Sequence, residues 1–151
     1  MVKGTAYWYK EDYESTLDSF NKALDYIDND PGLYNHLAST YARIGNEMKT
    51  EQDLHKAENL AERTNNTFEK AQSYRIRAEI AEDKENYIKA MDYYIVANDE
   101  YSRIQALVES HDCVEKIDGI MELIRRETGE VVRKNLILKQ EESFGDNIIF
   151  L

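Results

Sequence analysis

The chain has 151 residues, 42% of them apolar, which is enough for one compact domain with its own core. Thirty acidic residues against 19 basic ones give a net charge of −11, which disfavours a surface that neutralises nucleic-acid phosphates. One cysteine excludes an internal disulfide, and the absence of a long apolar run or a leader-like start predicts a cytoplasmic protein without a membrane span.

The composition favours helices throughout. Alanine, leucine, glutamate and lysine are common, whereas the single proline and six glycines supply little of the turn chemistry that strands require. The expected fold class is therefore all-α. A first helix is expected to end near residue 10, and a second over about 13–26 carries an apolar stripe at helical spacing.

The letters DNDPG stop the second helix and introduce a third. Asp30 before Pro31 is typical of a helix start, because aspartate accepts free amide hydrogens and proline is tolerated in the first turn. Gly45 predicts the end of that helix. A fourth helix is expected over about 48–63.

Polar residues then mark the start of a fifth helix, and two further helices follow. Glu69 follows Asn66 by three positions, which resembles a capping box. A sixth helix is expected over about 86–107, and apolar residues on one face predict a closing helix over about 112–127. Residues 128–151 fit neither the helical nor the strand period. They are left open as a short strand pair, a helix packed on the rest or a tail that docks on a neighbour.

Comparison of the chain with itself reveals a repeat of small residues. A shift of 34 positions places Ala23 on Ala57, and a shift of 40 places Ala57 on Ala97 and Ala38 on Ala78. Two antiparallel helices approach closely only where one contributes a small side chain and the other a large one. The repeat therefore predicts that these alanines mark helix contacts, and that the aromatic residues near the N-terminus fill a core instead of binding a cofactor.

The repeated letters resemble the tetratricopeptide repeat. The string YNHLASTY at residues 34–41 is similar to its first-helix pattern, and Ala90 four positions before Tyr94 is similar to its second-helix pattern. The similarity covers about residues 1–105, with a departure at Arg77, where leucine is expected. It implies a right-handed α-solenoid of about three helix hairpins followed by a closing helix. The implied domain is 1–127, with units of about 1–30, 31–66 and 67–108, and the tail is 128–151.

The resemblance also implies where a partner binds. In a solenoid of helix pairs, the first helix of each pair turns one stripe toward the concave side. On the family's pattern this stripe holds the candidate groove residues Trp8, Asn35, Ser39, Arg43, Gln72, Arg75 and Glu79. Asparagine can grip a peptide backbone, arginine can pair with carboxylates, and tryptophan offers an apolar anchor. The expected function is binding of an extended peptide or partner helix, and the acidic excess favours a basic partner.

No residue pattern indicates catalysis, a metal or a cofactor. The three histidines lack the spacing of a helical zinc motif, and Cys113 has no base nearby in the sequence. A phosphate-binding glycine loop and a nucleophile elbow are also absent from the sequence. The alternative interpretation is a self-assembling or regulatory segment of a larger signalling or transcription-control protein. Such a segment would form a homodimer through its first helix and the terminal letters NIIFL.

Overall fold

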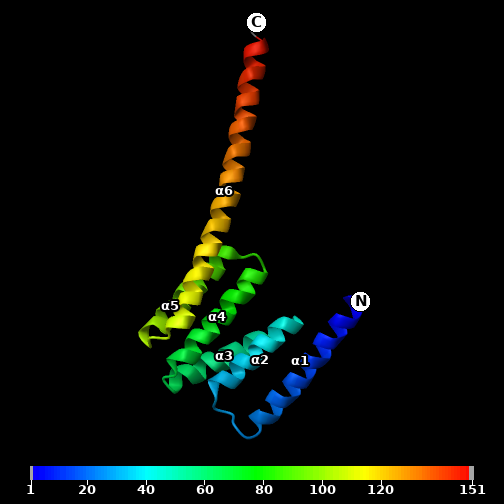
Figure 1. The fold of residues 1–151 in the computed structure, drawn as a ribbon, viewed down its shortest axis with the longest axis vertical. Coiled ribbons are helices and arrows are strands. Elements are labelled where there is room, and N and C mark those ends of the chain that lie inside the picture. Colours follow the sequence, from blue (N-terminus) through cyan, green and yellow to red (C-terminus); the bar gives the residue numbers. More distant parts are fainter. Residues whose placement is uncertain (1, 150–151) are drawn as a thin grey trace.

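The computed structural model describes the backbone of residues 2–149 and the side chains of residues 12–142. The six helices in this range are α1 (Val2–Leu24), α2 (Pro31–Ile44), α3 (Glu47–Arg63), α4 (Thr67–Asp83), α5 (Tyr87–Arg103) and α6 (Leu107–Ile149). No strand occurs between residues 2 and 149, which confirms the predicted all-α class. Consecutive helices lie antiparallel, and α6 extends well beyond the other five (Figure 1).

The turns between α2 and α6 recur at intervals of twenty residues. Each contains one residue in the left-handed backbone region: Gly45 (φ 87°), Asn65 (φ 52°), Glu85 (φ 58°) and Gln105 (φ 58°). In all four turns the N–H of the following residue donates to the carbonyl five positions back, as Asn66 does to Ala61 at 2.8 Å. This Schellman arrangement satisfies carbonyls that the end of a helix would leave unpaired.

Three of these turns also cap the helix that follows. The side-chain Oδ1 atoms of Asn46, Asn66 and Asn86 accept the backbone N–H three residues later, at 3.1, 3.1 and 3.4 Å. One short turn therefore ends one helix and starts the next in the opposite direction. The predicted helix start at Asn66 is confirmed, but the Glu69 carboxylate bonds to Asn35 of α2 instead of completing a capping box.

The predicted bounds of the third helix are confirmed. The Asp30 carboxylate accepts the Gly32 N–H at 2.8 Å, Pro31 occupies the first turn, and Gly45 ends α2 in the left-handed conformation. The sixth expected helix ends earlier than predicted, at Arg103, because the chain turns at Gln105. The closing helix accordingly begins at Leu107 and not near residue 112.

The forty-residue shift matches two helices along their whole length. Shifting α3 by forty positions reproduces the bounds of α5. Ala57 and Ala97 are both fully buried at equivalent positions, as are Ala38 and Ala78. Tyr94 of α5 is fully buried in one cluster with Ala71 and Ala78 of α4, so a bulky side chain on one helix packs with small residues on its neighbour in the centre of the fold, as the repeat predicts.

The first predicted helix pair is wrong. Residues 1–30 were expected to hold two helices, whereas α1 is one helix of 23 residues. The letters KEDYES at the expected turn contain no glycine, proline or asparagine, so no residue there favours the left-handed backbone that ends the other helices. Ala23 near the end of α1 is only half-buried, in contrast to its equivalents in α3 and α5.

The tail is a continuation of α6. The helix crosses the predicted domain boundary at residue 127 without a break and reaches Ile149, so the strand pair, one of the three alternatives left open, does not form there. The side chains of residues 130–142 are all exposed, so this segment is not a helix packed on the rest of the fold. A glycine inside a helix costs only about 1 kcal/mol, so Gly129 and Gly145 do not end α6.

Arg77 departs from the repeat pattern and forms ion pairs that link α4 to α3. It is equivalent to the buried Leu37 under the forty-residue shift, and its own side chain is 14% exposed on α4. Its guanidinium donates to both carboxylate oxygens of Glu51 on α3, at 3.0 and 2.9 Å, and to Glu58 Oε1 at 2.6 Å. The hydrogen bond from Arg77 lowers the pKa of Glu51.

Substitution of Gly45 should destabilise the fold. At φ 87° an alanine is strained, so Gly45→Ala should lower the free energy of unfolding by about 1 kcal/mol or more. Gly119→Ala is the matched control, since Gly119 lies inside α6 with open space around it and alanine should stabilise the helix by about 0.5–1 kcal/mol. Thermal unfolding measures both, and a stabilised Gly45→Ala would contradict the left-handed turn.

Removal of Arg77 should destabilise the fold in a pH-dependent way. Arg77→Ala should cost about 1–3 kcal/mol near neutral pH, because it breaks charged hydrogen bonds between α3 and α4. The lowered pKa of Glu51 means that this contribution is complete above the ordinary carboxylate pKa and is lost as pH falls through the lowered value. Urea unfolding over a pH series should therefore show the difference from wild type shrinking in acid. Arg63→Ala, on the exposed end of α3, should show little difference at any pH.

Candidate functional site

Two adjoining hollows lie between α2 and α4, and they share Ser39, Ile76 and Glu79. The larger, of about 510 Å³, lies toward the N-terminal ends of the two helices. The smaller, of about 280 Å³, lies toward their C-terminal ends, where Lys116 of α6 contributes to its lining. We call the two hollows together the α2–α4 groove. The predicted residues that line it are Asn35, Ser39, Arg43, Gln72, Arg75 and Glu79.

Helical spacing on each of two helices, and the packing of α2 against α4, bring these six residues together. Residues three or four positions apart share one face of a helix, so Asn35, Ser39 and Arg43 form a row on α2. Gln72, Arg75 and Glu79 form a second row on α4, and the two rows face one groove. The side chain of Trp8, the seventh predicted residue, is not among those that the structure describes.

Asn35 holds the walls of the groove together. It is only 4% exposed, and its Nδ2 donates to the backbone carbonyl and to Oε2 of Glu69, both at 2.9 Å. Its Oδ1 accepts from the Ser73 hydroxyl at 2.8 Å. These bonds occupy both ends of the amide, so Asn35 is not free to grip a peptide backbone as the sequence predicts. It fixes the distance between α2 and α4 instead.

Arg75 connects the groove to α6. Its Nε lies 3.4 Å from Glu79 Oε1, and a terminal nitrogen lies 3.7 Å from Asp112 Oδ2 of α6. Burial alone would lower the pKa of Arg75, but the neighbouring carboxylates, chiefly that of Glu79, raise it. The guanidinium therefore stays charged, and much of its capacity to bind a carboxylate is used within the chain.

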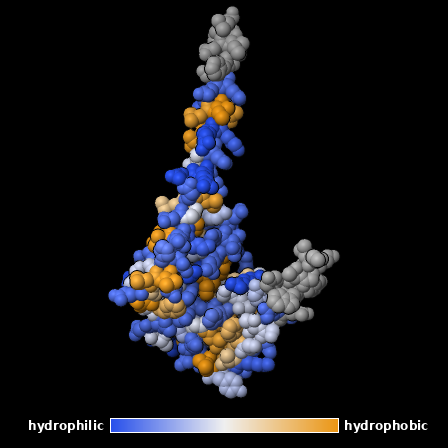
Figure 2. Space-filling model, viewed as in Figure 1, coloured by the Kyte–Doolittle hydropathy of each residue, from blue (hydrophilic) through white to orange (hydrophobic). Residues whose placement is uncertain are grey.

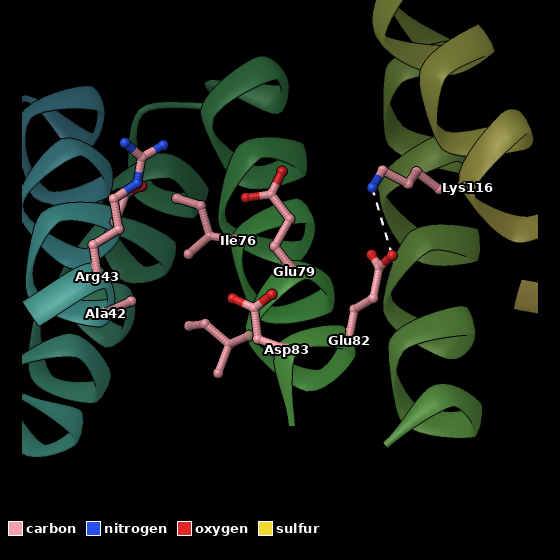
Figure 3. A pocket seen from close by; sticks show the side chains of 9 residues that line it. Ala42, Arg43, Ile76, Glu79, Glu82, Asp83 and Lys116 are labelled. Atoms are coloured by element: carbon pink, nitrogen blue, oxygen red, sulfur yellow. Dashed lines mark ion pairs between the residues drawn. The ribbon is translucent and has the colours of Figure 1, made fainter. Parts of the chain in front are cut away.

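Arg43 is the groove's available cation. Its side chain is exposed and forms no ion pair with any residue from 12 to 142. In Figure 3 Arg43 on α2 and Glu79 on α4 stand on opposite sides of the smaller hollow, with Ile76 between them. The groove thus offers a positive group on one wall, a negative group on the other and apolar surface between.

The C-terminal end of the groove is acidic. Glu79, Glu82 and Asp83 lie on the last turns of α4, and no basic residue occurs in its final turn. The Glu82 carboxylate accepts from the Tyr94 hydroxyl at 2.8 Å and lies 3.5 Å from Lys116, the pair marked in Figure 3. Carboxylates near the C-terminus of a helix add to its negative dipole end. This end of the groove therefore attracts a positive group.

Several lining residues were missed by sequence reasoning. Phe68 and Ile76 supply apolar surface to the larger hollow, and His36 at its edge stacks on Phe20 of α1 with ring centroids 5.5 Å apart. Ile76 lies four positions from Gln72, so helical spacing offered a signal for it. The sequence offered no such signal for Lys116, because only the packing of α6 brings this residue beside α4.

The part of the chain that the structure describes shows no sign of two other kinds of site. Among these residues no group of three histidine, cysteine or acidic side chains is arranged to hold a metal ion. No described helix combines the length and apolar character needed to cross a bilayer.

Comparisons with known proteins identify no relative. No protein-family model, curated protein or solved structure matches the chain. The similarity to the tetratricopeptide repeat thus depends on the sequence pattern alone.

Loss of the Asn35 amide should destabilise the fold. Asn35→Ala removes three hydrogen bonds between α2 and α4 and leaves the Ser73 hydroxyl only its bond to the Glu69 carbonyl, which should cost about 1–3 kcal/mol. Asn59→Ala, on the exposed face of α3, is the matched control and should change stability little. Urea unfolding compares the two variants, and equal stability would show that Asn35 does not hold α2 against α4.

Proposed function

We propose that the chain is a non-enzymatic interaction module that binds an extended peptide or a partner helix in the α2–α4 groove. One observation carries the proposal: six of the residues that the resemblance to the tetratricopeptide repeat selects as a binding stripe line this groove. Arg43 and Gln72 offer polar groups to a ligand, and Ile76 offers apolar surface between the walls. A trough with mixed walls suits a peptide, whose backbone and side chains require both kinds of contact.

The proposed architecture is a solenoid of tetratricopeptide-like helix pairs. In this view α2 pairs with α3, α4 pairs with α5, and α6 covers the last pair. The forty-residue repeat of helix bounds and buried alanines supports such pairs. Contacts of α2 with α4 across successive pairs are also in keeping with this arrangement.

The ligand we propose carries a basic side chain. The acidic end of α4 places Glu79 and Asp83 on the wall of the smaller hollow, and Asp83 forms no ion pair with any described residue. A lysine or arginine there would also offset the helix dipole. Arg43 on the opposite wall would pair with a carboxylate further along the same ligand. Binding by such charges should weaken with salt.

The groove can be tested with displayed peptides. Peptides selected against the wild-type chain should bind at least about tenfold more weakly to Ser39→Arg/Arg43→Glu, a loss of about 1.4 kcal/mol. The added arginine fills the point shared by both hollows, and the charge reversal removes the available cation. Calorimetry measures the affinities, and amide shifts on titration should cluster at Ser39, Gln72 and Glu79.

A matched control lies twenty residues further along the chain. Asn59→Arg/Arg63→Glu makes the same changes of charge on the exposed surface of α3, so the selected peptides should bind it as they bind wild type. Equal weakening in both variants, or peptides that bind both with wild-type affinity, would contradict binding in the groove.

A further inference from the structure

A lysine of the chain itself occupies the acidic end of the α2–α4 groove. Lys116 of α6 reaches toward α4, where its Nζ lies 3.5 Å from Glu82 Oε1 (Figure 3). Both residues line the smaller hollow, together with Glu79, Asp83 and Arg43. Three carboxylates therefore stand against two cations in this hollow, which leaves one negative charge without a counterpart.

The Glu82 carboxylate is held in position by the core. Its Oε2 accepts the Tyr94 hydroxyl at 2.8 Å, and Tyr94 is fully buried. Its Oε1 is the atom that faces Lys116, and we call this oxygen the cation seat. Because the hydrogen bond from Tyr94 fixes the carboxylate, the cation seat keeps its place without Lys116. A group already held in position loses little conformational freedom when a ligand binds.

Lys116 is the weakly held member of the ion pair. Its side chain is 50% exposed, against 29% for Glu82, and it forms no ion pair with any other described residue. An exposed pair of this kind contributes little to stability, because water solvates both charges and the long lysine side chain loses freedom when it is fixed. Another cation can therefore replace the Lys116 ammonium at small cost.

Displacement of the lysine side chain leaves α6 in place. Cys113 and Ile120 of this helix are buried in one core cluster with residues of α4 and α5. Asp112, about one helical turn before Lys116, also pairs with Arg75 of α4 at 3.7 Å. The Lys116 side chain can thus leave the groove while the backbone of α6 keeps its position.

The surroundings of the cation seat suit a basic side chain of a ligand. Glu79 lies three residues before Glu82 and four before Asp83, so the three carboxylates are neighbours near the end of α4. Ile76 and Ile80 line the same hollow and offer apolar surface to the methylene stem of a lysine or arginine. A ligand cation would therefore meet both the charge and the apolar support that it requires.

We infer that Lys116 competes with the ligand's basic residue: it occupies the cation seat in the free chain and is displaced when a lysine or arginine of the ligand binds there. The inference rests on the proposed function and adds a specificity residue to it, because a ligand without a basic group gains nothing by replacing Lys116. The alternative prediction, self-assembly through the first predicted helix and the letters NIIFL, concerns side chains outside the described ones.

Affinities of peptides selected by display against the wild-type chain test the competition. Lys116→Met should bind a selected peptide that contains lysine or arginine at least about threefold more tightly at low salt, because no internal cation has to be displaced. Replacement of the peptide's basic residues by glutamine should abolish this gain.

Lys134→Met is the matched control for the loss of one positive charge. Lys134 is exposed on the half of α6 that stands clear of the other helices (Figures 1 and 2), so this variant should bind the peptide as the wild type does. Selected peptides without any basic residue, wild-type affinity in Lys116→Met, or an equal gain in both lysine variants would overturn the inference.

A second substitution tests the cation seat itself. Glu82→Gln removes the negative charge, but its side-chain oxygen can still accept the Tyr94 hydroxyl. The basic peptide should bind this variant at least about threefold more weakly, and addition of Lys116→Met should no longer strengthen binding, because no cation seat is vacated. An undiminished gain would mean that Lys116 acts only by its charge at a distance, which is incompatible with competition for Glu82.

The groove proposal and this inference can fail separately. If Ser39→Arg/Arg43→Glu loses the peptide while Lys116→Met leaves its affinity unchanged, the competition is refuted and the groove proposal stands. If the peptide binds all these variants alike, both are refuted. Circular dichroism of Lys116→Met and Glu82→Gln should retain the wild-type spectrum, because an exposed ion pair adds little to stability.

Discussion

The fold depends on a turn that reverses the chain every twenty residues. One residue adopts the left-handed backbone and closes a helix, and the next residue, asparagine in three of four turns, caps the following helix. Hydrogen bonds within each turn thus pair some of the backbone groups that the two helix ends leave free. Helices of similar length must then lie antiparallel with little freedom to slide, and the positions that face each other are determined.

Close contact between these helices requires small residues at fixed points. Ala57 and Ala97 are fully buried in equivalent helices, and bulky residues such as Leu54 and Tyr94 fill the space beside them. Where the apolar pattern is interrupted at Arg77, hydrogen-bonded carboxylates take the place of an apolar contact. Charge and shape therefore serve the same purpose, which is to hold neighbouring helices at one spacing.

That spacing creates the groove and also sets its limits. The hydrogen bond between Asn35 and Ser73 joins α2 to α4 at the groove. The Asn35 amide is therefore used within the fold, and its neighbours are left to contact a ligand. Two features have no complementary surface among the described residues: the Asp83 carboxylate at the C-terminal end of α4 and the exposed apolar side chains on the C-terminal half of α6. Both become favourable when a complementary surface covers them.

The sequence by itself determined the local elements: the all-α class, the bounds of α2 and the helix start at Asn66. These follow from caps and helical periodicity, which act over a few residues. Only the tertiary structure decided three features. The Asn35 amide is fully hydrogen-bonded to α4, Lys116 borders the groove, and α6 continues beyond the other helices. Such features depend on distances between helices, and no spacing within one helix encodes them.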